Sequence, residues 1–432
     1  MKVHLMGIGG SGVSALAAVF VARGDSVSGC DLRESESTRR LREQGVSVAV
    51  GHNPDHVRGQ DMIVHSGAVK DAGQAELDAA RAAGVATLSR AETLAQLITE
   101  SRSIAVTGTH GKTTVTFMLG HILTQAGWDP TVLVADGLNA RAGHGRWLVA
   151  EADESDGSLE LHHPTHALLT GVELDHPDHF RDLGAVRDLF ALFLRKLPGD
   201  GLAVVCEDDP IASALPTTGR RVGYGYAASE FRCTDDRPFR LWHGDRELGP
   251  VPLRVPGRHN VQNACGAAAM AISLGVEFEV VATALGTFHG AHRRLEYVGA
   301  WRDAYIYTDY GHHPTEVAAT LQAAREIPFV ERLVLIFQPH RYSRFSALRD
   351  QFAGCFGGAD LVIITEIYGA GEENPGGVSA RDLAERVPGA TFATGGAELR
   401  RLLEETALPN DLLLFMGAGD IWEVARELAH QA

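Results

Sequence analysis

Residues 103–116 read SIAVTGTHGKTTVT, and this stretch decides the fold of the central part of the chain. The apolar run Ser103–Thr107 predicts a strand, and the apolar spacing of Thr113–Gln125 predicts a helix. Two glycines and a lysine lie between them, in residues 108–112. In such a loop the backbone N–H groups surround phosphate oxygens, the lysine reaches the β- and γ-phosphates, and the next threonine hydroxyl binds Mg²⁺. The stretch therefore predicts a strand–loop–helix unit that binds a nucleoside triphosphate.

The candidate ATP contacts lie in this loop and in the turn after it: Gly108, Thr109, His110, Gly111, Lys112, Thr113 and Thr114. The usual spacing of the motif places a glycine where this chain has Val106, so the loop is a variant. A glycine turn that only packs a strand against a helix is the alternative interpretation. It gives the lysine no role, so the Gly-Lys-Thr sequence favours a phosphate site.

A second glycine-rich loop lies near the start of the chain. The segment Gly7–Gly12, GIGGSG, follows a predicted strand and opens a predicted helix, and Asp31 ends the next strand. This spacing is typical of dinucleotide-binding proteins, which indicates an NAD-dependent oxidoreductase as one interpretation. The loop specifies only a diphosphate beside a ribose, however, so a UDP-sugar satisfies it equally well, and an unliganded turn is a further alternative. Two anion-binding loops in one chain predict two phosphorylated ligands, whereas NAD requires one such loop.

Length and charge limit the class of protein. The chain has 432 residues, of which 45% are hydrophobic, and at roughly 150 residues per domain this length predicts about three domains. The 39 Lys and Arg residues against 55 Asp and Glu residues give a net charge of −16. Such a surface repels polyphosphates in general, so we expect neither a nucleic-acid partner nor binding to an anionic membrane. Anionic ligands must be held by local groups.

The cysteines and the apolar runs indicate a cytoplasmic protein. The five cysteines are widely spaced with no C-x-x-C pair, which argues against a zinc ribbon and against a disulfide framework. No apolar run approaches the ~18 residues that a membrane-spanning helix needs, so membrane insertion is not expected.

Strand-like runs alternate with helical patterns along most of the chain, which is typical of the α/β class with mostly parallel strands. The predicted strands are Val3–Gly7, Ser103–Thr107, Trp147–Glu151, His166–Gly171, Leu202–Cys206, Leu333–Phe337, Asp360–Thr365 and Asp411–Met416. The predicted helices are Val13–Arg23, Thr113–Gln125, Ala185–Leu197, Val261–Ser273, Pro314–Glu326 and Ile421–His430. Short antiparallel strands are expected within residues 231–255. Breaks near residues 98 and 292 predict domains at 1–98, 99–292 and 293–432.

Two acidic motifs follow predicted strands. Residues 151–156 read EADESD, and residues 175–179 read DHPDH. Since parallel strands end at the same edge of a sheet, both motifs are expected beside the Lys112 loop, where carboxylate and imidazole groups can hold Mg²⁺. The alternative is a pair of solvated acidic turns. The nearby His162, His163 and His166 fit a polar turn better than a zinc site.

Several motifs together resemble the Mur ligases, and the resemblance covers residue 3 to about residue 425. They are Gly108–Thr114, Glu151–Ser158, Asp175–His176, Gly257–Ala264, His289–Glu296, Thr308–Glu316 and Gln338–Arg344. The resemblance implies an N-terminal Rossmann-like domain that binds the UDP-substrate, a central P-loop ATPase-like domain and a C-terminal Rossmann-like domain that binds the amino acid. It implies an ATP-dependent ligase of peptidoglycan synthesis that joins L-alanine to the carboxylate of UDP-N-acetylmuramate through an acyl phosphate.

The resemblance also implies roles for individual residues. The UDP-sugar contacts would be Gly7, Gly9, Gly10, Ser11, Gly12, Asp31, His65, Ser66 and Tyr310. Further ATP contacts would be Asn260, Asn263, Arg294 and Asp309, and the ligands of two Mg²⁺ ions would include Thr113, Glu154 and His176. Arg341 and Arg344 would anchor the carboxylates of alanine and of the muramyl group. His312 and His340 lie nearby, and either could be the base that accepts the amine proton.

The chain departs from the family pattern at three places. Ala135-Asp136 replaces a common glycine pair, Leu159 replaces an aromatic residue, and Ala191 stands where later Mur ligases carry a lysine. The last departure is what the alanine-adding branch predicts. Three alternatives remain open at this point: a recycling ligase that adds a tripeptide to the same UDP-sugar, the NAD-dependent oxidoreductase, and a non-catalytic nucleotide-binding regulator. The oligomeric state is also open.

Overall fold

The computed structural model describes residues 1–69, 71–134, 140–155, 157–177 and 179–430. Ala135, Asp136, Asp156 and Asp178, which belong to motifs discussed above, lie outside these ranges. The chain divides into two compact units. The first contains Met1–Val172, Gly184–Pro252 and Asn263–Thr287, and the second contains Glu173–Leu183, Leu253–Gln262 and Phe288–Ala432. None of the helices in the described ranges is long and apolar enough to cross a bilayer.

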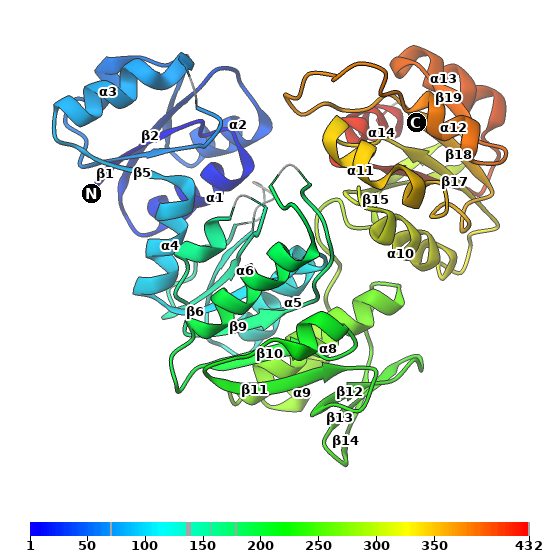
Figure 1. Cartoon of the computed structure of the whole chain (residues 1–432), viewed down its shortest axis with the longest axis horizontal. Helices are drawn as coiled ribbons and strands as arrows, with labels where there is room; N and C mark the ends of the chain where they lie inside the picture. The colour runs from blue at the N-terminus through cyan, green and yellow to red at the C-terminus, as the bar shows by residue number, and fades with distance from the viewer. Residues whose placement is uncertain (70, 135–139, 156, 178, 431–432) are drawn as a thin grey trace. The chain divides into compact units, whose positions relative to one another are not determined.

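The first unit begins with a parallel sheet, which is blue in Figure 1. Its strand order is β3-β2-β1-β4-β5. Its strands are β1 Lys2–Met6, β2 Ser26–Asp31, β3 Ser47–Val50, β4 Met62–His65 and β5 Ala86–Ser89. Its helices are α1 Ser11–Ala22, α2 Glu36–Glu43, α3 Gln74–Ala82 and α4 Arg90–Glu100, with short 3₁₀ helices η1 Pro54–Val57 and η2 Asp71–Gly73.

Strand alternation gives this sheet two buried faces. Val3 and Leu5 of β1 pack with buried side chains of α1 and α4. Met6 and Cys30, on the opposite face, pack with η1 and α3. Since successive side chains of a strand point to opposite faces, His4 lies on the same face as Met6. That face therefore contains a polar group within an otherwise apolar layer.

A second sheet of the first unit has the order β14-β13-β12-β11-β10-β9-β6-β8-β7. Its strands are β6 Arg102–Thr107, β7 Thr131–Leu133, β8 Trp147–Glu151, β9 His166–Leu169, β10 Leu202–Cys206, β11 Arg220–Gly225, β12 Phe231–Cys233, β13 Phe239–His243 and β14 Arg246–Val251. Its helices are α5 Lys112–Gln125, α6 Leu183–Arg195, α7 Pro210–Ala214, α8 Arg258–Ser273 and α9 Phe278–Gly286, with η3 Ser158–Leu161. The strands from β7 to β12 pair in parallel, whereas β12, β13 and β14 pair antiparallel.

The second unit contains a sheet in the order β15-β16-β20-β17-β18-β19, parallel except for the β15–β16 hairpin. Its strands are β15 Glu296–Trp301, β16 Ala304–Asp309, β17 Arg332–Phe337, β18 Leu361–Thr365, β19 Thr391–Ala393 and β20 Asp411–Met416. Its helices are α10 Pro314–Arg325, α11 Tyr342–Phe352, α12 Arg381–Arg386, α13 Gly395–Thr406 and α14 Ile421–Ala429. Leu333, Leu335 and Phe337 of β17 pack with α10, α11 and α12, and Val334 and Ile336 pack with α13 and α14.

The α/β class with mostly parallel strands is confirmed. Each predicted strand and helix occurs, with ends that agree to within a few residues. The antiparallel strands expected within residues 231–255 are β12, β13 and β14. The predicted boundaries near residues 98 and 292 stay predictions.

Candidate functional site

The first glycine loop connects β1 to α1 at the carboxyl edge of the first sheet. The N–H of Gly9 donates to Oδ2 of Asp31 over 2.8 Å. A Cβ atom on Gly9 would lie 2.9 Å from that same oxygen, so a side chain at this position would displace the Asp31 carboxylate. Ser66 follows β4, the neighbour of β1, and its Cβ lies 3.0 Å from where a side chain on Gly7 would begin. The structure thus brings Gly7–Gly12, Asp31 and Ser66 together, with His65 next to Ser66 in the chain.

The Lys112 loop connects β6 to α5, and carboxylates surround the lysine ammonium. Nζ of Lys112 donates to Oε2 of Glu154 over 2.7 Å and to the carbonyl oxygen of Gly108 over 2.8 Å, and Asp153 lies 3.4 Å away. Burial alone would lower the pKa of Lys112, but Glu154, Asp153 and Glu151 outweigh it and raise the pKa. Lys112 is therefore charged where a polyphosphate would bind.

The Thr113 hydroxyl, at the first turn of α5, faces the end of β8. Its Oγ1 lies 3.0 Å from each carboxylate oxygen of Glu151. Because β8 is the direct neighbour of β6 in the sheet, a parallel register delivers Glu151 to this position. Thr113 and Glu154 are thus both at the Lys112 loop.

The carboxylates near Lys112 fit a magnesium ion. Oε1 of Glu154 is buried and has no hydrogen-bond partner among the residues that the structure describes. Burial raises the pKa of Glu154 to about 8 against the attraction of Lys112, and the adjacent Asp153 adds to the rise. Glu151, Asp153 and Glu154 thus crowd a single ammonium, and a divalent cation bound there would favour their ionised forms. Carboxylate and hydroxyl oxygens are suitable ligands for Mg²⁺.

The glycines of the Lys112 loop are fixed by their surroundings. Gly111 has φ = +82°, and a Cβ atom there would lie 2.6 Å from Oδ1 of Asn263 on α8. Thr109 donates its N–H to the carbonyl oxygen of Gly171 over 3.0 Å, just beyond β9. The loop is therefore held between β9 and α8, and the predicted ATP contact Asn263 lies directly beside it. Asn260 belongs to the second unit, where its Nδ2 donates to the carbonyl oxygen of Pro256 over 2.7 Å.

In the second unit, predicted nucleotide contacts collect at the carboxyl edge of its sheet. Asp309 ends β16, is buried, and accepts N–H bonds from Leu295 over 2.8 Å and from Gly311 over 2.7 Å. Burial raises the pKa of Asp309 to about 6. The guanidinium of Arg294 lies 5.3 Å from the centre of the Tyr310 ring, which favours a cation–π contact. Asp309, Tyr310 and Arg294 are therefore neighbours.

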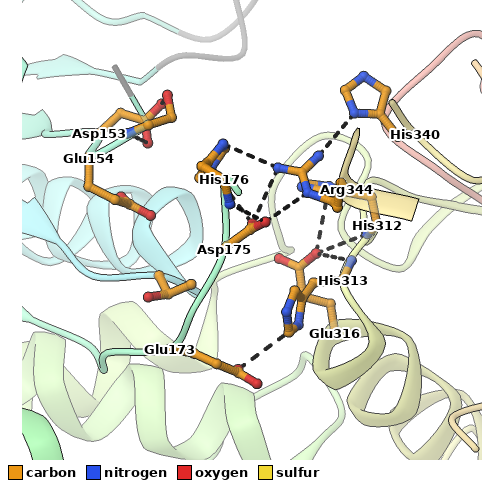
Figure 2. A network of polar contacts seen from close by, with 12 residues as sticks. Asp153, Glu154, Glu173, Asp175, His176, His312, His313, Glu316, His340 and Arg344 are labelled. Carbon is orange, nitrogen blue, oxygen red and sulfur yellow. Dashed lines mark hydrogen bonds and ion pairs between the residues drawn. The ribbon is translucent and has the colours of Figure 1, made fainter. Parts of the chain in front are cut away.

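Arg344 lies at the centre of a polar network in the same unit (Figure 2). Its Nε donates to Oδ1 of Asp175 over 2.7 Å and its Nη2 donates to Oδ2 over 3.3 Å, so the pair is forked. Nη2 also lies 3.3 Å from Nδ1 of His176, and Nη1 lies 3.1 Å from Nδ1 of His340. All the guanidinium nitrogens thus contact protein groups, and the side chain is buried. Arg341, at the start of α11, is partly exposed.

The two candidate bases, His312 and His340, have different hydrogen-bond partners. Nδ1 of His312 lies 3.1 Å from the carbonyl oxygen of Tyr310, which can only accept, so Nδ1 carries the hydrogen and Nε2 the lone pair. Nδ1 of His340 accepts from Arg344, so its lone pair is already engaged. Burial is the main reason that the pKa of His312 is lowered to about 3 and that of His340 to about 2. Both rings are neutral at neutral pH.

Some predicted groups are brought together and others are not. Lys112, Thr113, Glu154 and Asn263 meet in the first unit, whereas His176 lies in the second unit beside Arg344. A common metal-ligand set of Thr113, Glu154 and His176 therefore stays a prediction.

Sequence reasoning missed two further polar groups of the second unit. Asp175 was named only within the motif at residues 175–179, which was expected to hold Mg²⁺, and its contacts with Nε and Nη2 of Arg344 were not predicted. Glu316 accepts the N–H of His312 over 2.9 Å and that of His313 over 3.2 Å. A signal for Glu316 was present, because it stands three residues after a helix N-cap, His313, as in a capping box.

Known family models match nearly the whole chain. The model described as "Mur ligase family, catalytic domain" matches residues 2–102, "Mur ligase middle domain" matches 106–271, and "Mur ligase, glutamate ligase domain" matches 293–419.

Curated proteins and solved structures agree with these matches. The UDP-N-acetylmuramate–L-alanine ligase of Geobacter sp. (strain M21) is 41% identical over 446 residues, 99% of this chain and 96% of that protein. The protein of the same name from Solidesulfovibrio magneticus is 41% identical over 441 residues, 98% of this chain and 96% of that protein. The crystal structure of UDP-N-acetylmuramate-alanine ligase from Thermotoga maritima has a TM-score of 0.83 and 29% identity, and the match covers 100% of this chain and 99% of that one.

A murein peptide ligase from Psychrobacter arcticus shares the fold, with a TM-score of 0.75 and 24% identity over 99% of this chain and 98% of that one. The family models and the full-length curated relatives all belong to the Mur ligases. They exclude the interpretation of the first glycine loop as part of an NAD-dependent oxidoreductase. The chain belongs to the Mur ligase family.

Proposed function

We propose that this protein is an ATP-dependent ligase that joins L-alanine to the carboxylate of UDP-N-acetylmuramate in peptidoglycan synthesis. The carrying observation is the loop between β6 and α5, in which Lys112 contacts Glu154 and the Thr113 hydroxyl contacts Glu151. These are the groups that a phosphoryl-transfer site needs. The names of the full-length relatives support alanine and UDP-N-acetylmuramate as the other substrates.

The reaction needs ATP because a carboxylate and an amine do not condense in water. In the proposed first step, an oxygen of the muramyl carboxylate attacks the γ-phosphorus of ATP, forms an acyl phosphate and releases ADP. In the second step, the neutral amine of alanine attacks the acyl carbon, the C–O bond to phosphate breaks, and the amine loses a proton. The products are the amide, ADP and phosphate. The first step places an anion against a polyanion, so it requires positive charge at the site.

The chain supplies part of that charge itself. Lys112, kept protonated by its neighbouring carboxylates, offers its ammonium to the phosphate oxygens. Glu154 and Thr113 are the residues proposed to hold Mg²⁺, and the ion, when bound, would neutralise charge on the phosphoryl group. A second ion near His176 is part of the same proposal. Gly7–Gly12, at the N-terminus of α1, would bind the diphosphate of the UDP-sugar.

Of the two histidines, His312 is the better candidate for the base. Its Nε2 carries a lone pair, whereas the lone pair of His340 accepts from Arg344. Arg341 is the better anchor for a substrate carboxylate because it is partly exposed, whereas Arg344 is buried and forked onto Asp175. In this proposal Arg344 positions His340 and His176, and Arg341 meets the substrate.

The proposed location is the cytoplasm. All the cysteines, Cys30, Cys206, Cys233, Cys265 and Cys355, are buried and free. Unpaired thiols are typical of a reducing compartment, where ATP is also available.

The test is phosphate release from ATP in the presence of UDP-N-acetylmuramate, with and without L-alanine. We expect release that depends on alanine, and we expect Lys112→Ala to lower it at least about 100-fold, since one electrostatic contact to a transition state contributes a factor of that order. Lys196→Ala is the matched control, because Lys196 directly follows α6 and, among the described residues, its ammonium donates only to the carbonyl oxygen of Glu160. If phosphate is released with the tripeptide L-Ala-D-Glu-diaminopimelate but not with alanine, the protein is the recycling ligase instead. If neither alanine nor the tripeptide stimulates phosphate release, the proposal is contradicted.

The choice of base has a separate test. We expect His312→Gln to lower alanine-dependent turnover by roughly 10²- to 10⁴-fold, the usual contribution of a general base. His340→Gln should cost less, because the glutamine amide oxygen can still accept from Arg344. An equal loss in both variants, or a larger loss in His340→Gln, would contradict the assignment.

A further inference from the structure

A buried cluster of nitrogen, sulfur and carboxylate groups lies on one face of the first sheet. His4 of β1 and Cys30 of β2 point to this face, and His56 of η1 and Glu76 of α3 cover it. Cys30 and Glu76 are fully buried, and the His4 and His56 side chains are 3% and 21% exposed. The proposed reaction uses none of these side chains.

The atoms of this cluster are spaced like the ligands of one metal ion. Nε2 of His4 lies 3.0 Å from Oε1 of Glu76 and 3.4 Å from Sγ of Cys30. Nδ1 of His56 lies 3.2 Å from Oε1 of Glu76, and Sγ of Cys30 lies 3.6 Å from Oε2. One ligand atom from each residue lies within 4.8 Å of every other. Ligands of tetrahedral zinc, at 2.0–2.3 Å from the ion, are about 3.3–3.8 Å apart, which is close to these separations.

Many potential hydrogen-bonding groups surround the Glu76 carboxylate. It is approached by the ring nitrogens of His4, His52 and His56, the N–H of Asn53 and the thiol of Cys30. A carboxylate offers about four lone-pair positions, which the four groups other than His4 can fill. With the lone pair of His4 on Nε2, that nitrogen then faces Oε1 at 3.0 Å as a second acceptor. A cation that replaces the thiol proton would satisfy sulfur, nitrogen and oxygen at once.

Groups outside the cluster orient its members. Nδ1 of His4 lies 2.9 Å from the hydroxyl oxygen of Ser28, which pairs with His4 across the β1–β2 register. With Nδ1–H donating to Ser28, the lone pair of His4 is on Nε2, which faces the cluster. The N–H of Asn53 donates to Oε2 of Glu76 over 3.1 Å. Metal-bound histidines and carboxylates commonly have such outer partners.

We infer that His4, Cys30, His56 and Glu76 form a structural binding site for a divalent transition-metal ion, most simply Zn²⁺. A thiolate, a carboxylate and two neutral imidazoles would balance the charge of Zn²⁺, as a buried site requires. Binding releases the thiol proton and any proton on the ligating nitrogens, and no electron is transferred. The Cys30 carbonyl oxygen accepts N–H bonds from Gly7 over 2.8 Å and from Ile8 over 3.1 Å. The ion would therefore fix the strand end beneath the first glycine loop. This inference does not depend on the proposed function.

The test is a Co²⁺ titration of the full-length, metal-stripped protein in reducing buffer with excess Mg²⁺. Magnesium occupies oxygen-ligand sites and does not compete well for thiolate and imidazole. We expect one equivalent of Co²⁺ to produce a thiolate-to-cobalt charge-transfer band and the strong visible bands of tetrahedral cobalt. Zn²⁺ should displace the cobalt. A wild-type protein without the thiolate band, or with only weak octahedral bands, would overturn the inference.

Variants locate the site. Cys30→Ser should remove the charge-transfer band. Cys355→Ser should keep it, because this thiol is buried in an apolar cluster of the second unit and, among the described residues, hydrogen-bonds only to the Phe352 carbonyl oxygen. Ser28→Ala should weaken zinc binding about 10- to 100-fold, as loss of an outer partner does, and His56→Gln should weaken it at least as much. His56 is partly exposed, so this variant is expected to fold even if Cys30→Ser does not. Zinc affinity unchanged in His56→Gln and Ser28→Ala, or a thiolate band retained in Cys30→Ser, would overturn the inference.

Discussion

At the scale of single residues, replacing Thr113 tests whether its hydroxyl contributes to the proposed ATP site. Its hydroxyl lies equally close to both oxygens of Glu151, and the side chain is 8% exposed. Thr113→Val keeps the shape but removes the hydroxyl, and a hydrogen bond to a charged group is worth about 1.5–3 kcal/mol. We expect kcat/KM for ATP to fall at least about 10-fold, measured by initial rates of phosphate release.

Thr113→Ser is the matched control because it restores the hydroxyl without the methyl group. We expect it to retain most of the wild-type kcat/KM. Equal losses in the valine and serine variants would mean that packing of the methyl group, and not the hydroxyl, is what the site needs.

His166 predicts how stability depends on pH. Its Nδ1 accepts the N–H of Leu202 over 3.1 Å, which requires the neutral ring, and burial together with the charge of Arg102 lowers its pKa to about 4. In the unfolded chain, His166 has a pKa near the usual 6.5. Between pH 6.5 and 4, His166 is therefore protonated in the unfolded state but neutral in the native state. The free energy of unfolding therefore falls as the pH falls through this window, by roughly 3 kcal/mol from this residue.

The measurement is urea unfolding of the wild type and of His166→Gln at several pH values. Glutamine keeps an acceptor oxygen and does not titrate, so the variant should lose less stability between pH 6.5 and 4. Parallel stability curves for the two proteins would show that His166 does not contribute to the acid sensitivity.

At the scale of elements, helix α5 has a glycine in the left-handed region just before its start and another just after its end. Gly111 has φ = +82° and Gly127 has φ = +77°. A Cβ atom on Gly111 would lie 2.6 Å from Oδ1 of Asn263, whereas nothing lies within 4 Å of one on Gly127. We expect Gly127→Ala to cost about 1–2 kcal/mol, the cost of an alanine in this conformation, and Gly111→Ala to cost about 1–3 kcal/mol more from the clash.

Denaturant unfolding of both variants measures this difference, and the ATP-dependent reaction gives a second readout. Gly127→Ala should keep its activity, since it lies at the far end of α5 from Lys112. Gly111→Ala should lose activity even at temperatures where it is fully folded. Equal destabilisation of the two variants would contradict the predicted contact with Asn263.

Elements and local motifs were largely predictable from the sequence, because their signals are short-range. The strand Ser103–Thr107, the loop after it and helix α5 are contiguous, so apolar spacing and the Gly-Lys-Thr sequence were enough to predict them. Glu151 lies at the end of another strand, and its contact with Thr113 depends on β8 pairing directly with β6. Strand order is a property of the whole sheet, so no local sequence pattern predicts it.

At the scale of the whole molecule, the features that the sequence did not reveal are those whose members are far apart in the chain. His4, Cys30, His56 and Glu76 come from four separate elements, and no metal-binding spacing connects them. Wide spacing of the cysteines argued against a zinc ribbon and a disulfide framework, but it does not bear on a site whose ligands are far apart in the sequence. The resemblance implied that Arg344 anchors a substrate carboxylate, and no local pattern indicated its forked partner Asp175, which is 169 positions away in the chain.

The Arg344–Asp175 pair predicts how the segment Glu173–Leu183 is held within the second unit. Both side chains are buried, at 3% and 6% exposure, and Asp175 is ionised because Arg344, His176 and His312 lower its pKa against the effect of burial. Removing one partner of a buried ion pair leaves the other charge without compensation, which typically costs 3–5 kcal/mol. We expect Asp175→Asn to lower the free energy of unfolding by about that amount, measured by urea denaturation.

Asp382→Asn is the matched control within the same unit. Asp382 lies 3.9 Å from Arg349, and both side chains are more than two-fifths exposed, so water screens this pair and its loss should change stability by less than about 1 kcal/mol.

A double replacement, Asp175→Asn with Arg344→Met, separates the two roles of the buried pair. If the cost of Asp175→Asn comes from the guanidinium left without a counter-charge, removing that guanidinium should recover part of the free energy of unfolding. If the free energy of unfolding falls further instead, Arg344 stabilises the unit mainly through His340 and His176. The segment Glu173–Leu183 is then held by its remaining contacts, such as the hydrogen bond of 2.8 Å from Thr315 to Glu173.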